Sequence, residues 1–336
     1  MVVNSKFFMS LALKEAWKYQ GLTYPNPAVG CVIVGKNNEL LAVNAHQKAG
    51  SPHAEVMALR DAYVKLTNDS KILSIASSNN IHTYILNNHN NCFKDISLYT
   101  TLEPCSHIGE TPSCASLISD LRIKKVFVGF NDLNIEASCG NDILRKNGVE
   151  VIESLLEREC EELAHPFNRW NKEKFVFFKW AQRLDGSTND GIISSNASRN
   201  NVHAIRDVCD LLVIGGNTVR LDRPSLDARL VNGKAPDILI ISREKDFDET
   251  IPLFNIDGRK VIIADNFSIL NEYKNIMIEG SSKMLKLSRE VVDYYLCYIA
   301  PTMKNSNGFD SIEEKFIILN IRQVERDIIM WMKREL

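Results

Sequence analysis

Side chains that bind zinc well occur in two short motifs in the first third of the chain. His53 stands in the stretch Ser-Pro-His-Ala-Glu, and Cys105 follows Pro104 in the second motif. A third donor, Cys114, comes nine positions after Cys105. One imidazole and two thiolates leave the fourth tetrahedral position of a zinc ion free for water, as in catalytic zinc sites. The pattern therefore predicts an open Zn²⁺ site that carries out hydrolytic chemistry.

Glu55 is the candidate proton carrier of this site. Two thiolates cancel the formal charge of zinc, so a bound water should be less acidic there than in an all-histidine site and needs a nearby base. His-x-Glu followed by a later Pro-Cys is the signature of zinc deaminases, in which hydroxide attacks a ring carbon and the Glu passes the proton to the leaving ammonia. The motif predicts deamination of an amino-pyrimidine-like ring.

Other interpretations of these residues remain open. His53 and the two cysteines are also compatible with a structural zinc site or with unliganded core residues. His107, in the loop between the cysteines, would close the site as a fourth ligand and block the water position.

The local sequence also predicts where the ligands sit on helices. Ser51 and Thr111 are each an N-cap candidate followed by a proline, which places His53 and Cys114 in the first turns of two helices. A helix N-terminus stabilises the thiolate form that binds zinc.

The first half shows an alternating α/β pattern. Helical spacing predicts helices over 5–19, 112–122 and 141–147, and apolar runs predict strands over 29–34, 40–44, 98–101, 126–130 and 149–152. The segment 67–95 is rich in Asn and is interpreted as a surface excursion. Its His82, His89 and Cys92 match no common metal-site spacing, so a second metal site is not favoured there.

Composition and charge restrict the function class. The chain has 336 residues with 45% hydrophobic and 24% charged side chains, which is typical of a folded protein of two domains. A formal charge of -2 supplies no positive field for a nucleic-acid backbone, so a small-molecule substrate is favoured. No stretch approaches the length of a membrane span, the start lacks a secretory signal pattern, and eight scattered cysteines suit reduced thiols. These features predict a cytoplasmic enzyme without nucleic-acid or membrane partners.

The second half begins after a change of composition at 153–174. Apolar runs predict strands over 175–180, 211–214, 238–241, 260–264 and 294–299. Residues 316–333 suggest two strands around a polar turn, with a C-terminal helix as the alternative. We predict domains at 1–150 and 175–336, joined by a linker helix and connection over 151–174. No G-x-G-x-x-G motif follows a strand, so a Rossmann site is not indicated.

Residues from about 7 to 150 resemble the deaminase half of the bifunctional riboflavin-biosynthesis deaminase/reductase family. The resemblance rests on three stretches, 24–30 (YPNPAVG), 46–55 (HQKAGSPHAE) and 101–114 (TLEPCSHIGETPSC), and includes the nine-residue cysteine spacing. It implies a cytidine-deaminase-like α/β/α domain that deaminates 2,5-diamino-6-ribosylamino-pyrimidinone 5'-phosphate. Zinc would lie on His53, Cys105 and Cys114, with Glu55 as the proton shuttle, and Asn26 would line the base pocket.

The second half resembles the reductase domain of the same family more loosely, through 179–186 (KWAQRLDG), 215–218 (GGNT) and 222–229 (DRPSLDAR). The resemblance implies a dihydrofolate-reductase-like α/β fold in which NADPH reduces the ribosyl group to ribityl. NADPH would contact Ala181, Thr218, Asp222, Ser242 and Gly280. The substrate would be held by Arg206, Leu226, Arg229 and Glu279. The segments 190–194 and 279–283 depart from the family pattern.

Three other functions remain open. A monofunctional deaminase with a non-catalytic second half would not bind NADPH. A deaminase that acts on a flipped nucleic-acid base shares the zinc motif but needs a basic surface. A zinc-stabilised binding module needs a fourth protein ligand. The sequence does not fix the oligomeric state and leaves a homodimer open.

Overall fold

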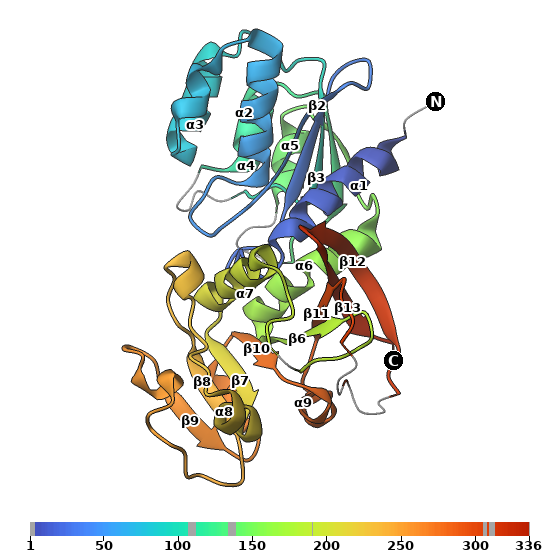
Figure 1. The fold of residues 1–336 in the computed structure, drawn as a ribbon. Coiled ribbons are helices and arrows are strands. Elements are labelled where there is room, and N and C mark those ends of the chain that lie inside the picture. Colours follow the sequence, from blue (N-terminus) through green and yellow to red (C-terminus); the bar gives the residue numbers. More distant parts are fainter. Residues whose placement is uncertain are drawn as a thin grey trace. The chain divides into compact units, whose positions relative to one another are not determined.

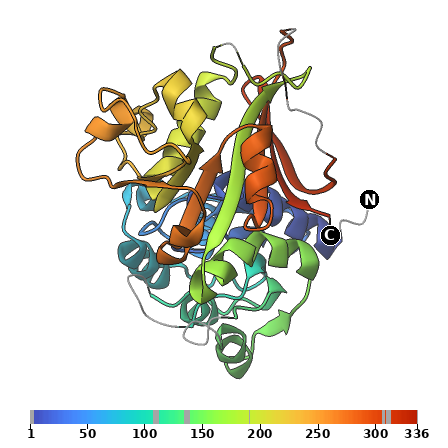
Figure 2. The ribbon, with the colours of Figure 1, turned by 90° about the horizontal axis from the view of Figure 1, so that it is seen from below.

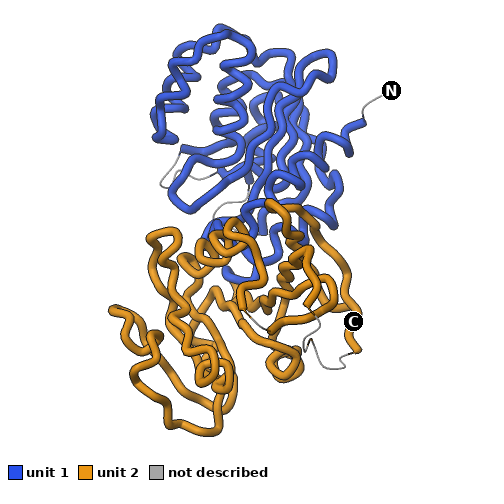
Figure 3. The backbone as a smooth tube through the Cα atoms, viewed as in Figure 1, with its two compact units in different colours: residues 1–171 blue, residues 172–336 orange. Residues whose placement is uncertain are grey.

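The computed structural model describes residues 4–106, 112–133, 139–189, 191–304, 308 and 313–335. Its backbone divides into two compact units, residues 1–171 and 172–336, which are coloured separately in Figure 3. Both units combine helices and strands, which confirms the predicted α/β class. In the described ranges no helix is long and apolar enough to span a bilayer.

A five-stranded sheet with the order β2-β1-β3-β4-β5 forms the centre of the first unit. β1 pairs antiparallel with β2 and β3, whereas β3, β4 and β5 run parallel. The strands are β1 (Gly30–Val34), β2 (Leu40–Ala45), β3 (Ser97–Leu102), β4 (Lys125–Phe130) and β5 (Glu150–Ile152). The helices are α1 (Ser5–Ala16), α2 (Ala54–Thr67), α3 (Ser78–Asn88), α4 (Cys114–Asp120), α5 (Gly140–Lys146) and α6 (Glu157–Lys172), with 3-10 turns η1 (Trp17–Tyr19) and η2 (Ser70–Ser74).

Helices cover both faces of this sheet. Alternate residues of β1 point to opposite faces, so each face presents side chains that a helix can pack against. Cys31 and Ile33 share a buried cluster with Leu59 of α2. On the other face α1 approaches so closely that a Cβ on Gly30 would lie 2.0 Å from the Ala12 carbonyl oxygen. Only glycine allows this approach of helix to strand. Figure 1 shows α1 and α2 on either side of the strands.

The prediction of a surface excursion over 67–95 is wrong. The segment folds into η2 and α3, and α3 places Ile81 and Ile85 in the buried cluster with η2 residue Ile72. Ile81 and Ile85 are four residues apart, so they lie on one face of the helix. Exposed asparagines surround this short apolar stripe. Because they are so numerous, they suggest a loop and make the helical spacing of the isoleucines hard to recognise.

The second unit is built on an eight-stranded sheet with the order β12-β13-β11-β6-β10-β7-β8-β9. The strands from β11 to β9 in this order are parallel, and β13 and β12 extend the sheet as an antiparallel hairpin. Figure 2 shows β6, drawn yellow-green, near the middle of the sheet. The strands are β6 (Phe175–Arg183), β7 (Leu211–Gly215), β8 (Asp237–Ile241), β9 (Val261–Ala264), β10 (Asn275–Glu279), β11 (Tyr294–Ala300), β12 (Phe316–Val324) and β13 (Asp327–Arg334). The helical elements are α7 (Asn196–Val208), α8 (Gly216–Asp222), α9 (Ser282–Ser288), η3 (Arg229–Val231), η4 (Pro252–Asn255) and η5 (Ser268–Glu272).

Two features of this sheet bear on the predictions. Residues 316–333 form strands, as predicted, and the alternative of a C-terminal helix is wrong. β10, which pairs with both β6 and β7, is absent from the predicted strands. Its five residues include a polar residue at each end, Asn275 and Glu279, so the apolar run is too short to stand out. β10 ends at Glu279 and so brings this predicted site residue between two other strands.

Candidate active sites

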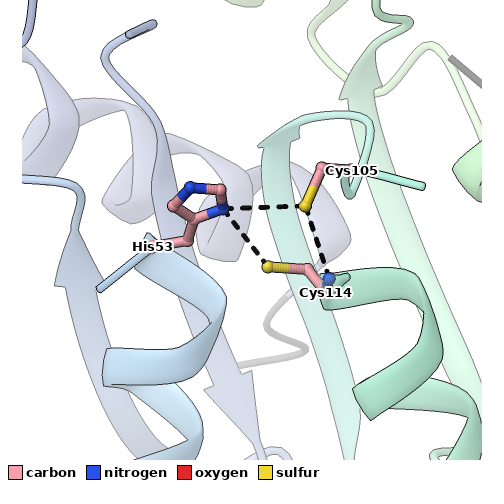
Figure 4. A group of neighbouring side chains, drawn as sticks. All are labelled: His53, Cys105 and Cys114. Atoms are coloured by element: carbon pink, nitrogen blue, oxygen red, sulfur yellow. Dashed lines mark hydrogen bonds between the residues drawn. The ribbon is translucent and has the colours of Figure 1, made fainter. Parts of the chain in front are cut away.

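The three predicted zinc ligands meet at the ends of three elements of the first unit. His53 is the N-cap residue of α2, Cys105 follows β3, and Cys114 is the first residue of α4. Figure 4 shows the imidazole and both sulfur atoms directed toward a common point. α2 packs against β1 and β2, and β1 pairs with β3, so the start of α2 comes next to the chain that follows β3.

The distances between these donors suit a zinc ion. Nδ1 of His53 lies 3.7 Å from the Cys105 sulfur and 3.5 Å from the Cys114 sulfur. Tetrahedral zinc with ordinary Zn–N and Zn–S bonds separates such donors by about 3.6 Å. The backbone N–H of Cys114 also donates to the Cys105 sulfur at 3.4 Å, which favours a negative charge on that sulfur.

The predicted helix starts are partly wrong. α2 begins at Ala54, so His53 occupies the N-cap position, without a capping hydrogen bond from its side chain, and does not lie in the first turn. Ser51 does not cap α2, because its hydroxyl donates to the Lys48 carbonyl and closes a turn before the helix. Cys114 does begin α4, but Ser113 provides the cap by accepting from the Ser116 N–H. Thr111 and His107 lie outside the described residues.

Glu55 lies in the first turn of α2 and is buried beside the three donors. A cavity of about 220 Å³ opens here, lined by Glu55, His53, Cys105, Asn26 and other residues of the first unit. Burial raises the pKa of Glu55 from 4.5 to about 7, and the neighbouring Cys105 adds to this shift. A carboxyl with this pKa can both accept and release a proton near neutral pH.

Asn26 lines the same cavity and is oriented by His46. The Asn26 side-chain nitrogen lies 3.2 Å from Nε2 of His46, whose Nδ1 lies 3.3 Å from the Pro52 carbonyl oxygen. Burial, together with the neighbouring His53, lowers the pKa of His46 to about 4, so the ring is neutral at pH 7. A neutral ring that donates from Nδ1 to the carbonyl must accept at Nε2, which fixes Asn26 as the donor. The carbonyl oxygen of the Asn26 amide can then accept a hydrogen bond from a ligand.

Three charged side chains of the second unit form a buried cluster. Glu279, at the end of β10, lies 2.8 Å from Nη2 of Arg206 on α7 and 3.5 Å from Nζ of Lys179 on β6. Burial alone would raise the pKa of Glu279, but the charges of Arg206 and Lys179 lower it to about 2. Lys179 also lies over the Tyr298 ring, 5.7 Å from its centroid. The cluster therefore contains two cations and one carboxylate that are largely shielded from solvent.

Two other predicted substrate residues flank Asp227, which contacts this cluster: Leu226 in the loop before η3 and Arg229 at the start of η3. Leu226 is buried and has a left-handed backbone, with φ of 53°. Arg229 is more exposed and donates to both carboxylate oxygens of Asp227 at 2.8 Å. Nη1 of Arg206 donates to the Asp227 carbonyl oxygen at 3.3 Å. Asp227 thus connects Arg206 with Arg229.

A cavity of about 710 Å³ opens at the carboxyl ends of parallel strands β7, β8 and β10. Three of the five predicted NADPH contacts line it, Thr218, Ser242 and Gly280, whereas Ala181 and Asp222 are not among its lining residues. Crevices at this end of parallel strands are the usual ligand sites of open α/β sheets. Gly280 is needed there, because a Cβ would lie 2.5 Å from the Met284 Cβ.

Two titratable residues in these sites, His46 and Lys179, carry no role in the sequence prediction. His46 stands within the HQKAGSPHAE stretch, and Lys179 opens the KWAQRLDG stretch. Lys179 had a usable signal, since it is a single charge in the apolar run of a central strand. His46 had none, because its importance depends on the contact with Asn26.

Family models match both halves of the chain. The cytidine and deoxycytidylate deaminase zinc-binding region matches residues 3–130, and the RibD C-terminal domain matches residues 174–304. A riboflavin biosynthesis protein RibD of Aquifex aeolicus is 30% identical, with 98% of each chain covered. A RibD of Actinobacillus pleuropneumoniae is also 30% identical over 88% of this chain and 83% of its own.

The chain belongs to the RibD family.

Solved structures agree with this assignment. The diaminohydroxyphosphoribosylaminopyrimidine deaminase/5-amino-6-(5-phosphoribosylamino)uracil reductase of Thermotoga maritima is similar with a TM-score of 0.65, at 26% identity and 98% coverage of both chains. RibD of Acinetobacter baumannii has a TM-score of 0.64 at 25% identity, covering 98% of this chain and 99% of its own. Both RibD halves are present here, so the chain is a bifunctional deaminase and reductase of riboflavin biosynthesis, and a scaffold role for its second half is not favoured.

Proposed function

We propose that His53, Cys105 and Cys114 hold Zn²⁺ and that the adjoining cavity binds 2,5-diamino-6-ribosylamino-pyrimidinone 5'-phosphate. The observation that carries this proposal is the convergence of the three donors at 3.5–3.7 Å beside a buried carboxyl. Zinc bound there would supply a Lewis acid that makes water a nucleophile at neutral pH. A site with three protein ligands leaves a position for that water.

Glu55 moves the proton in this proposal. The net reaction adds water to a ring carbon and releases the amino group as ammonia, so one proton must pass from the water to the leaving nitrogen. Glu55 is buried beside the three donors, so its carboxylate can accept the proton from the water and return it to the leaving nitrogen. Asn26, held by His46, orients the ring through its free carbonyl oxygen.

The second unit binds NADPH and the deaminated intermediate. The cofactor lies in the 710 Å³ cavity, where Thr218, Ser242 and Gly280 contact it, and Ala181 and Asp222 complete the predicted set. NADPH supplies the hydride that converts the ribosyl group to ribityl. Arg206, Leu226, Arg229 and Glu279 hold the phosphorylated sugar, because guanidinium groups bind phosphate oxygens in pairs. Lys179 adds a buried positive charge next to Glu279.

The proposed division places the deaminase at 1–150, a connection at 151–174 and the reductase at 175–336. The enzyme acts on a small phosphorylated pyrimidine in the cytoplasm, without nucleic-acid or membrane partners. A homodimer is compatible with this proposal.

A coupled assay with the diamino-pyrimidinone phosphate tests both halves. Wild-type protein should release ammonia first and then oxidise NADPH. Removal of zinc with a chelator should abolish ammonia release but spare NADPH oxidation when the deaminated intermediate is supplied. Ammonia release that survives complete zinc removal would refute the zinc assignment, and failure to oxidise NADPH with that intermediate would refute the reductase assignment.

A further inference from the structure

Arg259 lies just before β9 and directs its guanidinium group at four backbone carbonyls. Nε donates to Pro236 O at 2.9 Å, Nη1 to Ser225 O at 2.7 Å, and Nη2 to Leu226 O at 2.5 Å. Nη1 also lies 3.5 Å from Leu253 O. Arg259 is half-buried and bonded to carbonyls, and no carboxylate of the described residues lies within ion-pair distance of it, so it acts on the backbone around it.

Two of these carbonyls belong to the peptide groups on either side of Leu226. The Ser225 carbonyl orients the peptide that precedes Leu226, and the Leu226 carbonyl orients the peptide that follows it. Fixing both peptide planes fixes φ and ψ of the residue between them. Leu226 has φ of 53°, a left-handed region that is unfavourable for leucine and persists only where the surrounding structure holds it. The rigid, planar guanidinium group of Arg259 holds Leu226 in this conformation by binding both carbonyls at once.

The orientation of Leu226 sets the direction of the residues that follow. Asp227 comes next, and its carboxylate holds Arg229 while its carbonyl oxygen accepts from Arg206. Arg259 and Arg206 therefore bind successive carbonyls of the same short loop from two different elements.

We propose that Arg259 is the positioning residue of the phosphosugar site, holding Leu226 left-handed so that Arg206 and Arg229 face the substrate. This inference rests on the proposed reductase function of Arg206, Leu226 and Arg229. Arg259 itself remains bonded to the backbone and does not touch substrate. Burial lowers the pKa of Arg259 to about 10, which still leaves it charged at neutral pH.

The test compares Arg259→Gln and Arg259→Lys with Lys260→Gln, which removes an exposed positive charge from the adjacent position. Gln loses the charge and most donors, and Lys keeps the charge but cannot reach the separated carbonyls together. With the deaminated intermediate as substrate, KM should rise about 10-fold or more in Arg259→Gln and by less in Arg259→Lys. NADPH affinity, measured by fluorescence quenching, and ammonia release from the diamino substrate should match wild type in all three variants.

Several outcomes would overturn the inference. One is a folded Arg259→Gln protein whose KM for the intermediate stays within twofold of wild type. Full restoration by Arg259→Lys would show that charge alone matters, and an equal loss of NADPH affinity would show a general structural role. If Arg259→Gln does not fold, Arg259→Lys decides by the same criteria. A wild-type protein that fails to reduce the intermediate would instead refute the proposed reductase function, and this inference with it.

Discussion

Arg206 and Glu279 form a largely buried ion pair in which two guanidinium nitrogens share one carboxylate oxygen. Nε and Nη2 of Arg206 donate to Oε1 of Glu279 at 3.1 and 2.8 Å, and the two side chains are 11% and 14% exposed. The other oxygen of Glu279 faces Lys179. Removing one partner of such a pair leaves a buried charge without its full compensation.

Arg206→Ala and Arg229→Ala should therefore differ, although both are expected to weaken substrate binding. Arg229 is 57% exposed, so its loss should lower kcat/KM for the intermediate by about 10- to 150-fold with little change in stability. Arg206→Ala should lower kcat/KM similarly and also cost about 3 kcal/mol or more of stability. NADPH absorbance and thermal unfolding measure the two effects.

Arg326→Ala is the matched control, because Arg326 is also 57% exposed and pairs with an Asp in the β12–β13 hairpin. It should keep wild-type reductase kinetics. Ammonia release should be unchanged in all three variants, since the zinc ligands lie in the first unit. Unchanged reductase kinetics in both Arg206→Ala and Arg229→Ala would exclude these residues from substrate binding.

The zinc ligands could be predicted from the sequence because each one lies in a short motif whose spacing is itself informative. Arg259 and β10 could not, for a physical reason. The partners of Arg259 are the carbonyls of Ser225, Leu226, Pro236 and Leu253, and a carbonyl has no sequence signature. β10 is recognisable only by its place between β6 and β7, which tertiary pairing decides.

In the segment 67–95 a helical signal was present in the sequence, but the asparagine-rich composition led to the prediction of a surface excursion. Seven asparagines suggest a loop, but helix α3 needs only Ile81 and Ile85 on one face to join the core. Tertiary burial of that face stabilises the helix more than the propensity of its exposed residues opposes it.

Glu55→Gln should keep zinc and abolish ammonia release. The amide is close in size to the carboxyl but neither accepts the proton from water nor returns it to the leaving nitrogen. Loss of general acid-base catalysis should lower kcat by on the order of 10²-fold or more. Zinc analysis and an ammonia assay on the same preparation measure both properties, and near-wild-type ammonia release at full zinc occupancy would remove Glu55 from this role.

Cys105→Ser and Cys114→Ser should each lower zinc content and destabilise the first unit, because metal binding stabilises the fold that presents the ligands. Cys139→Ser is the control, since Cys139 is an exposed cysteine whose sulfur is not part of the group of three donors. NADPH oxidation with the deaminated intermediate should persist in all three variants. Full zinc occupancy in both Cys105→Ser and Cys114→Ser would show that the ligand assignment is wrong.

His203 on α7 should make the second unit less stable as the pH falls below about 6.5. The imidazole is buried, and Nδ1 accepts a hydrogen bond from the Leu230 N–H at 3.5 Å. Burial, reinforced by the positive charge of Arg206, lowers the pKa of His203 from 6.5 to about 4. Between pH 6.5 and 4 the unfolded chain therefore binds a proton that the folded chain does not.

This difference gives the sign of the effect. Above pH 6.5 the ring is neutral in both states and the stability does not depend on it. As the pH falls toward 4, the free energy of unfolding should decrease, by on the order of 1 kcal/mol at pH 5 after allowance for solvent screening.

His203→Gln keeps an acceptor for the Leu230 N–H but does not titrate in this range. Other titrating groups, including the zinc ligands, affect wild type and variant equally. The difference in pH-dependent stability between the two proteins therefore reports on His203 alone. Urea unfolding at pH 7.5 and pH 5 should show a larger loss of stability in wild type than in His203→Gln. Equal losses in both proteins would show that His203 is already protonated in the folded state or does not contribute to the pH dependence.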